Sequence, residues 1–416
     1  MNFEVLKRSH IKRNIVIAVI IILILSAVIL TFTKAKYKTT ASIPLVNGTI
    51  NYDLSDLNLI GVYIQEGEEY KQTNEIPSSG YKFNSEESYC TINNERDDTI
   101  TLSFDMTTQN LTVTPLTKKG TKCYLYFDEH KIPANEYILA SENAPTNSTT
   151  DWTNNGTGIT YYYAGDTNEV NNLVSFAGFY WRIIRINGDG TIRMIYQGTS
   201  ANTTGSGTQI ETSAFNSSWD NNMYVGYMYK SGELHGLEES STIKGVLDNW
   251  YINNIADEAD YIDGNAGFCG DRRVSSGTGI GTRETEYQSD TRIRNSSPSL
   301  SCETLDIYTM KGSVTGNATL DYPIGLISAD EAMFAGIPMS GSNQNNYLYT
   351  GEIYWTISPS NYSGSAGVFI VGSSGNLGNY VVNATYGVRP VINIRADVAL
   401  TGSGTTDNPF KIVGAE

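Results

Sequence analysis

Cysteine is the residue type with the clearest chemistry in this 416-residue chain, which contains four cysteines. Cys90 and Cys123 fall in one predicted domain, and Cys269 and Cys302 fall in another. We therefore predict the disulfides Cys90–Cys123 and Cys269–Cys302, each of which would close a loop of about 33 residues. Free buried cysteines and a zinc site are the alternatives. The zinc site has little support, because there is no C-x-x-C spacing and the histidines are scattered, at His10, His130 and His235.

The segment from Tyr354 to Ile394 carries a second chemical signal, which is that of a binding surface. It begins with Tyr-Trp-Thr-Ile-Ser-Pro-Ser and ends with Gly-Val-Arg-Pro-Val-Ile-Asn-Ile. Between these ends, most of the residues that are not aliphatic are Ser, Asn, Tyr or Gly. Tyrosine gives rigid amphipathic contact area, while Ser, Gly and Asn give adaptable hydrogen bonding. The segment contains no visible pair of nucleophile and base, so it predicts binding without catalysis.

Patterns for catalysis or metal binding are weak in the rest of the sequence. A Ser-His-Asp triad would need a histidine in the larger domain, which contains only His235. Asp330 and Glu331 form a carboxylate pair, but together with Ser328 they fit a helix capping box. The Asn-Gly-Asp-Gly turn at residues 187–190 predicts a β-hairpin, since it lacks the spaced acidic ligands of a calcium loop. We therefore assign no catalytic residue, metal or cofactor, and calcium is left unplaced.

Charge and composition narrow the class of partner. The net charge is −16, and residues 1–38 are net basic, so the remainder is even more acidic than the whole chain. Such a surface repels phosphate backbones, and we expect no nucleic-acid partner. Only 17% of the residues are charged. The low share of charged residues is balanced by many Gly, Ser, Thr, Asn and Tyr residues. This composition is typical of loop-rich extracellular β proteins.

Residues 15–32 form an apolar run without a charge, which is long enough to span a bilayer as a helix. We predict an uncleaved signal anchor, with residues 1–14 as a cytoplasmic tail. The protein would then be a single-pass protein of the cell membrane, with its C-terminal domains extracellular. A cleaved signal peptide is the alternative, although no clear small-x-small cleavage site follows the apolar run.

Turn signals divide the rest of the chain into domains. After a stem at residues 33–42, residues 43–128 contain short strand-like runs separated by turns, which predict a small β-sandwich stalk. Residues 129–158 are interpreted as a linker, and residues 159–413 as one larger domain. Inside this domain, residues 240–255 have the apolar spacing of a helix.

The larger domain contains, in this order, the motifs FYWRIIRINGDGTIRMIY, STIKGVLDNWY, AGFCGDR, YPIGLISADEAMFAG, YWTISPS, SSGNL, GVRPVINI and the tail ADVALTGSGTTDNPFKI. This ordered series resembles a group of surface proteins of gut Firmicutes. Those proteins are similar to C-type-lectin-like folds, formylglycine-generating enzymes and variable proteins diversified by retroelements. The resemblance implies an α+β C-type-lectin-like head, preceded by the small all-β sandwich domain and one N-terminal transmembrane helix.

The resemblance also implies roles for single residues in the C-terminal segment. Its rigid frame would consist of Trp355, Pro359, Arg389 and Pro390. Ligand-binding positions would lie on this frame at the polar and aromatic residues between its ends, namely Asn361, Tyr362, Ser363, Ser365, Phe369, Asn376, Asn379, Tyr380, Asn383 and Tyr386.

Together, these features predict a membrane-anchored, adhesin-like binding protein whose ligand is a protein or glycan on another cell or host surface. Two alternatives stay open, an enzyme on a formylglycine-generating-enzyme-like fold and a structural envelope protein without a soluble ligand. The enzyme departs from its family pattern. Those enzymes use a cysteine pair near the C-terminal end of the domain, and no cysteine follows Cys302.

Overall fold

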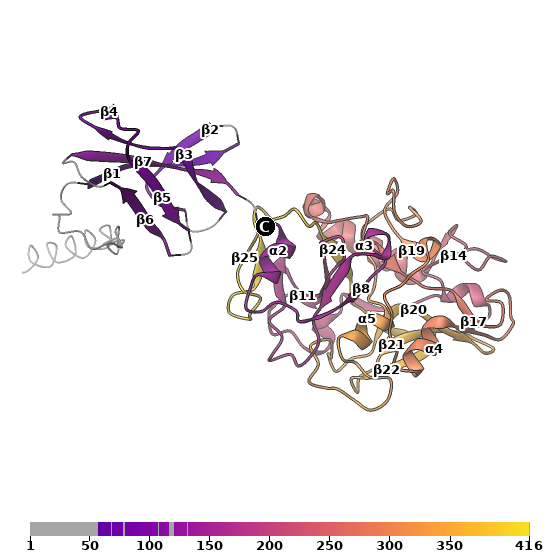
Figure 1. Ribbon diagram of the computed structural model, residues 1–416. Helices are drawn as coiled ribbons and strands as arrows, with labels where there is room; N and C mark the ends of the chain where they lie inside the picture. Colours follow the sequence, from indigo (N-terminus) through magenta and orange to yellow (C-terminus); the bar gives the residue numbers. More distant parts are fainter. Residues whose placement is uncertain are drawn as a thin grey trace, which may run out of the picture. The chain divides into compact units, whose positions relative to one another are not determined.

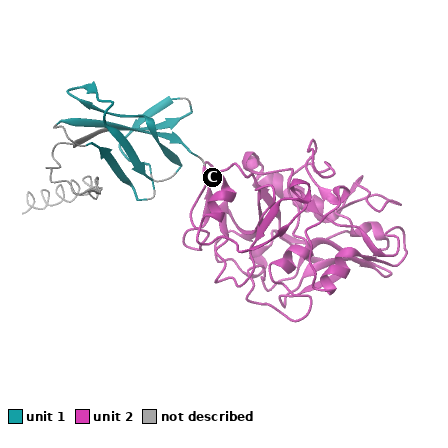
Figure 2. Ribbon diagram, in the orientation of Figure 1, with its two compact units in different colours: residues 1–130 teal, residues 131–416 magenta. Residues whose placement is uncertain are grey.

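The computed structural model describes residues 57–67, 69–77, 80–106, 108–115, 120–130 and 132–415. The chain forms two compact units, the first ending at His130 and the second starting at Lys131 (Figure 2). The predicted cytoplasmic tail, membrane anchor and stem lie outside the described residues. Within the described ranges, every helix is too short or too polar to span a bilayer.

The described residues of the first unit form strands (Figure 1). A five-stranded sheet has the order β2-β1-β7-β3-β4, and β5 pairs with β6 in a separate two-stranded sheet. The bounds are β1 Leu57–Glu66, β2 Glu69–Thr73, β3 Tyr81–Ile92, β4 Glu95–Arg96, β5 Thr101–Asp105, β6 Asn110–Thr114 and β7 Thr121–Glu129.

Alternation along the central strand β7 explains where the core of the first unit lies. Cys123, Leu125 and Phe127 are buried, while the residues between them are only half-buried. Side chains at every second position of a strand share one face, so one face of β7 is apolar and packs into the core. Cys90 of β3 lies directly opposite Cys123, and the two form the predicted disulfide.

The second unit contains two larger sheets. The first has eight strands, with the order β24-β12-β11-β10-β26-β25 and with β8 and β9 attached beside β11. The predicted hairpin is present as β11 and β12, joined at residues 187–191. The bounds are β8 Asn147–Thr150, β9 Ile159–Tyr162, β10 Leu173–Phe176, β11 Phe179–Ile186, β12 Ile192–Gly198, β24 Val391–Ile394, β25 Leu400–Thr401 and β26 Phe410–Ile412.

The other large sheet contains most of the C-terminal segment. Its order is β13-β23-β20-β18-β17, and β21 and β22 extend from β20. The bounds are β13 Glu211–Ala214, β17 Val274–Ser276, β18 Thr285–Tyr287, β20 Tyr354–Tyr362, β21 Ala366–Val371, β22 Leu377–Val381 and β23 Thr385–Val388. Two short pairs complete the strands, β14 Met228–Tyr229 with β15 Glu239–Ser240 and β16 Phe268–Cys269 with β19 Ile307–Tyr308.

Helices are few and short. Ser241 caps the longest described helix by accepting a hydrogen bond from the Lys244 amide, and Ser328 and Glu331 form the predicted capping box of α5. The α-helices are α2 Ala134–Leu139, α3 Thr242–Asn254, α4 Gln288–Arg294 and α5 Ala329–Phe334. The 3-10 helices are η2 Asn154–Gly156, η3 Gly205–Thr208, η4 Asn222–Val225, η5 Ala256–Tyr261 and η6 Thr304–Asp306.

The predicted fold class, an α+β C-type-lectin-like head after a β-sandwich and a transmembrane helix, is wrong for the residues that the structure describes; the predicted transmembrane helix lies outside them. The described residues are mainly strands in several sheets, and the helices are minor additions. The helix predicted at residues 240–255 is present as α3, but it is a short helix in a unit that consists mostly of strands. Many strands of two to five residues, spaced by Gly, Asn and Ser, are too short to show period-two alternation in sequence. Residues 129–158 are interpreted above as a linker, but residues 132–158 contribute α2 and β8 to the second unit.

Candidate ligand-binding site

Trp355 is fixed at the centre of the C-terminal segment. The side chain is fully buried on β20, and the indole Nε1 donates a hydrogen bond to the Ser213 carbonyl oxygen at 2.8 Å. Phe215 contacts the indole edge to face, with ring centroids 5.9 Å apart. Because both the ring and its polar nitrogen are engaged, Trp355 links β20 to β13, the strand on the other side of β23.

Arg389, which lies between β23 and β24, binds backbone carbonyls of β12 and of the loop before β20. Its Nε and Nη2 donate to the Tyr196 carbonyl oxygen at 3.2 and 2.9 Å, and its Nη1 donates to the Leu348 carbonyl oxygen at 3.1 Å. The guanidinium also lies 4.7 Å from the centre of the Tyr354 ring. Burial lowers the pKa of Arg389. Like Arg389, Pro359 and Pro390 are buried.

The structure separates the predicted ligand-binding residues into three groups. Tyr362 and Phe369 are buried, so they belong to the core. Ser363, Tyr380 and Asn383 are exposed. The remaining predicted positions are half-buried, namely Asn361, Ser365, Asn376, Asn379 and Tyr386.

Strand register brings some of these residues to one end of the sheet. Gly367 of β21 pairs with Val381 of β22, and the Val382 amide donates to the Ala366 carbonyl oxygen at 3.0 Å. The turns at 363–365 and 382–384 therefore lie side by side. Asn376 lies in the turn between β21 and β22, which is at the opposite end of these strands.

Trp219 also lies at this end, and sequence reasoning missed it. Its carbonyl oxygen accepts a hydrogen bond from the Ala366 amide at 2.8 Å, and its side chain is 43% exposed. The sequence does contain a signal for an exposed contact residue here. Trp219 is the one tryptophan in the polar stretch Asn-Ser-Ser-Trp-Asp-Asn-Asn, and a large apolar side chain is unusual in such a loop. We call the resulting surface the hairpin rim; it consists of Trp219, Ser363, Ser365, Tyr380, Asn383 and Tyr386.

The aromatic residues of the hairpin rim rest on the buried frame. Tyr386 contacts Trp355 on one side and Tyr380 on the other, with ring centroids 5.3 and 5.1 Å apart. Burial, together with a hydrogen bond to Tyr380, raises the pKa of Tyr386 to about 12. Tyr380 is 50% exposed, so the outer ring of this stack is open to a ligand.

Asn379 and Asn361 take part in internal hydrogen bonds. The Asn379 amide donates to Ser360 Oγ at 2.6 Å and to Asn361 Oδ1 at 3.4 Å. Ser360 Oγ donates in turn to Asp290 Oδ1 at 2.7 Å. These contacts support the sheet, and they leave the two asparagines less free for a ligand than the rim residues.

The carboxylate pair at Asp330 and Glu331 is structural. Asp330 pairs with Arg292 at 2.8 Å, and Glu331 pairs with Arg185 at 2.9 Å and Arg193 at 2.5 Å. Burial raises the pKa of Glu331, but the charges of Arg193 and Arg185 outweigh this effect and hold its pKa low. Buried charges without such partners would be very costly, which explains why these side chains occur together.

His235 and Asp306 form the one feature that bears on the enzyme alternative. The imidazole Nδ1 lies 3.0 Å from Asp306 Oδ1, and Arg272 donates to the same carboxylate. A histidine oriented by an aspartate can act as a general base, but it needs a nucleophile within hydrogen-bond reach. Across the described residues, Asp306 is the only hydrogen-bond partner found for this imidazole, and no group of three metal-ligating side chains occurs.

No family model, curated protein or solved structure matches the chain. The resemblance to surface proteins of gut Firmicutes therefore stays a prediction from the motifs.

Proposed function

We propose that the protein is a surface-exposed binding protein, anchored in the cell membrane by its N-terminal apolar run, which contacts a protein or glycan ligand through the hairpin rim. The observation that carries this proposal is the position of two exposed aromatic side chains, Trp219 and Tyr380, at the sheet end that also presents Ser363 and Asn383. Aromatic anchors surrounded by small polar groups dominate many binding surfaces.

Rigidity of the frame supports the same proposal. Binding costs less conformational entropy when the protein residues that contact the ligand are already ordered in the free protein. Tyr386 and Tyr380 rest on the buried Trp355, and Arg389 holds the neighbouring backbone. The rim therefore combines an exposed surface with an ordered support.

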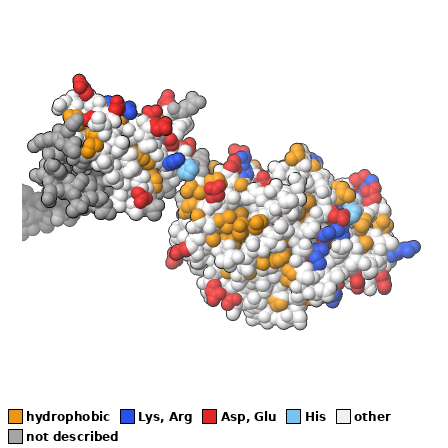
Figure 3. Space-filling model, viewed as in Figure 1, with side chains coloured by type: hydrophobic (Ala, Val, Ile, Leu, Met, Phe, Trp, Pro, Cys, Tyr) orange, Lys and Arg blue, Asp and Glu red, His pale blue; other side chains and the backbone are white. Residues whose placement is uncertain are grey.

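Two disulfides, Cys90–Cys123 and Cys269–Cys302, support a location outside the cytoplasm. Disulfides persist in oxidising compartments and are rare in the cytosol. The face of the second unit seen in Figure 3 is mostly uncharged, with small groups of charged side chains and several hydrophobic patches. Such a surface suits contact with neutral polar partners better than contact with strongly charged ones.

A binding screen tests the proposal. The full chain would be applied to glycan and peptide arrays beside the Trp219→Ala and Tyr380→Ala variants. Loss of an aromatic anchor typically costs 2 kcal/mol or more, so we expect each variant to weaken binding by about 30-fold. Array hits would be checked by calorimetry on the same proteins.

Ile252→Ala is the matched control, because Ile252 is an exposed apolar residue on α3 outside the hairpin rim. It should bind like the wild type. A ligand that binds both rim variants with wild-type affinity would show that the hairpin rim is not its site.

A further inference from the structure

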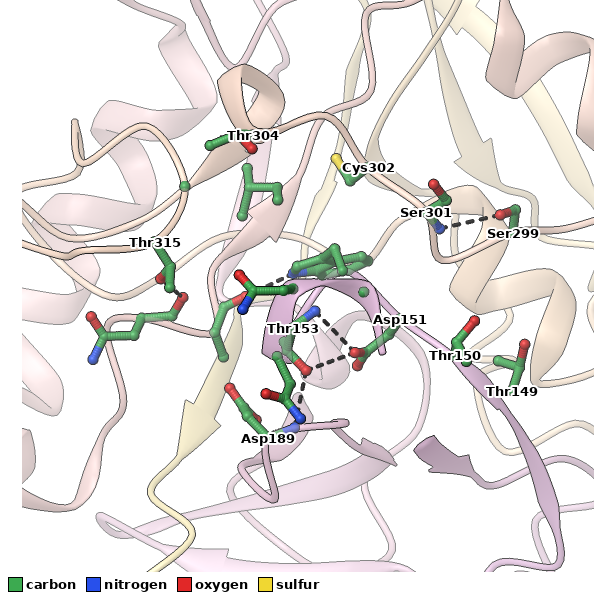
Figure 4. Close-up of a pocket in the computed structure, with 18 of the residues that line it drawn as sticks. Thr149, Thr150, Asp151, Thr153, Asp189, Ser299, Ser301, Cys302, Thr304 and Thr315 are labelled. Carbon is green, nitrogen blue, oxygen red and sulfur yellow. Dashed lines mark hydrogen bonds between the residues drawn. The ribbon is translucent and has the colours of Figure 1, made fainter. Parts of the chain in front are cut away.

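The second unit contains a cleft of about 610 Å³ that includes no residue of the hairpin rim. Its walls come from stretches far apart in the sequence, at residues 149–156, 189, 265–266, 298–307 and 314–316 (Figure 4). Small-molecule sites usually enclose about 300–1,000 Å³. The cleft therefore has the dimensions of a ligand site.

A buried ion network holds the floor of the cleft. Asp151, which is 2% exposed, accepts hydrogen bonds from the Thr153 amide at 3.0 Å, Thr153 Oγ1 at 2.6 Å and the Gly188 amide at 3.1 Å. The same carboxylate pairs with Arg185, whose Nε donates to Glu331 at 2.9 Å. Figure 4 shows Asp151, Thr153 and Asp189 in the middle of the cleft. Because these contacts occupy its carboxylate, Asp151 stabilises the floor of the cleft and is not available to a ligand.

Trp152 fixes the floor to the wall that carries the disulfide. Its ring lies 4.4 Å from the Arg185 guanidinium, and its Nε1 donates to the Ala266 carbonyl oxygen at 2.7 Å. Trp152 also packs in a small apolar cluster with Cys269, Cys302 and neighbouring residues. The shape of the cleft is therefore set before a ligand arrives, which lowers the ordering cost of binding.

The cleft is lined by polar side chains that are free to bind a ligand. Among the described residues, no hydrogen-bond partner is found for the side chains of Thr149, Thr150, Asn155, Asn265, Ser301 and Thr304. A hydroxyl both donates and accepts, and an amide offers two donors and one acceptor. The lining therefore presents donors and acceptors side by side on several walls.

Charge is nearly absent from the described lining. It contains no Lys, Arg or His, and beyond the engaged Asp151 its one carboxylate is Asp189. Asp189 Oδ1 accepts hydrogen bonds from the Thr191 amide at 3.0 Å and from Thr191 Oγ1 at 2.7 Å, which leaves Oδ2 open to a donor from a ligand. An anionic ligand would find no cation here and would be repelled by Asp189.

We propose that this cleft binds a short, uncharged oligosaccharide. Sugar hydroxyls match the mixture of donors and acceptors on Thr, Ser and Asn, and one can donate to Asp189. A peptide would instead be expected at an open sheet edge or in pockets for apolar side chains. The lining also offers apolar surface, which can contact the C–H faces of a sugar; it comes from Trp152, Ala266, Pro298, Cys302, Ile307 and the 98% exposed Val314. This site is independent of the ligand proposed for the hairpin rim.

Calorimetry on the full chain tests the cleft with defined probes. The probes are trimers of glucose and of N-acetylglucosamine in α and β linkage, a trimer of galacturonic acid, and an uncharged Ser/Ala tripeptide. We expect binding of at least one uncharged trimer, and weaker or no binding of the acidic trimer and the peptide.

Variants locate the bound sugar. Thr304→Val and Asn265→Ala each remove a free polar group and should weaken binding by about two- to tenfold, the usual effect of one hydrogen bond. Thr291→Val, at an exposed threonine of α4 outside the cleft, should bind like the wild type. Trp219→Ala should also keep sugar binding, which separates this proposal from that for the hairpin rim.

Three results would overturn the proposal. One is no binding by any uncharged trimer at millimolar concentration, and another is stronger binding of the acidic trimer or the peptide. The third is unchanged sugar affinity in the Thr304→Val and Asn265→Ala double variant, whose fold is checked by its tryptophan fluorescence.

Discussion

Asp306 shows how a buried carboxylate of this protein is kept ionised by its neighbours. It accepts hydrogen bonds from the Arg272 amide at 2.7 Å and from Arg272 Nε at 3.0 Å, and it contacts His235 at 3.0 Å. Burial raises the pKa of Asp306, but the hydrogen bond from His235 and the charge of Arg272 outweigh it, so its pKa is lowered. The carboxylate stays ionised because its partners replace the lost water.

His235 should make the stability of the second unit depend on pH. The hydrogen bond to Asp306 raises the pKa of His235 above its ordinary 6.5, although partial burial opposes this effect and Arg272 weakens it further. A pKa raised by folding contributes stability that is complete below the unfolded pKa and is lost as pH rises through the folded pKa. His235→Gln should therefore cost more stability at about pH 5.5 than at about pH 8.5.

Urea unfolding at both pH values measures this difference. All five tryptophans lie in the second unit, so tryptophan fluorescence reports on that unit alone. His130→Gln, at an exposed histidine of the first unit, is the control and should leave this signal unchanged. If His235→Gln lost the same stability at both pH values, the charged form of His235 would not stabilise the second unit, and the prediction would be wrong.

At the scale of elements, the turn between β11 and β12 packs directly on the backbone before β9. A Cβ atom added at Gly158 would lie 2.3 Å from the Gly188 carbonyl oxygen, which is too close for any side chain. The Gly188 amide also donates to Asp151. Two glycines therefore allow the close approach that places this turn beside the floor of the cleft.

Gly158→Ala should lower the free energy of unfolding of the second unit by about 1–3 kcal/mol, because the added methyl group forces two backbone segments apart. Gly245→Ala is the matched change. Gly245 lies inside α3, and an added Cβ would meet nothing within 4 Å. This variant should be more stable than the wild type by about 0.5–1 kcal/mol. Urea unfolding followed by tryptophan fluorescence measures both, and wild-type stability in Gly158→Ala would refute the close contact.

At the scale of the whole molecule, each unit has its own hydrophobic core and its own disulfide. The core of the first unit includes Leu125, Phe127 and the Cys90–Cys123 bond, while that of the second unit draws on both large sheets. A separate core allows a domain to fold as a unit of its own. The stability of the two units can therefore be changed one at a time.

Removing the first disulfide should affect only the first unit. The Cys90→Ser/Cys123→Ser variant loses the cross-link that closes a loop of about 33 residues. This loss should lower the free energy of unfolding of the first unit by roughly 3–4 kcal/mol. Hydrogen exchange of the β7 amides would detect this loss. Tryptophan fluorescence in urea should show an unchanged transition for the second unit, and a shifted transition would mean that the two units unfold together.

Local signals were the part of the structure that could be predicted from the sequence. The two disulfides, the hairpin between β11 and β12 and the capping box at Ser328 are confirmed. The last two depend on residues only a few positions apart, so their chemistry is visible in a short window of sequence. The overall fold class was wrong, because β pairing joins distant residues, as where Ile192 of β12 pairs with Ile394 of β24.

The sequence by itself determined which residue types are available for binding, and only the tertiary structure decided which of them are exposed together. Composition indicated the segment from Tyr354 to Ile394 as a binding surface. In the structure, however, the packing of β20 to β23 buries Phe369 and places Asn376 at the end of the strands opposite the hairpin rim. The same long-range pairing brought Trp219 to the hairpin rim and assembled the cleft from five separate stretches. The physical reason is that exposure depends on neighbours in space, and most of these neighbours are remote along the chain.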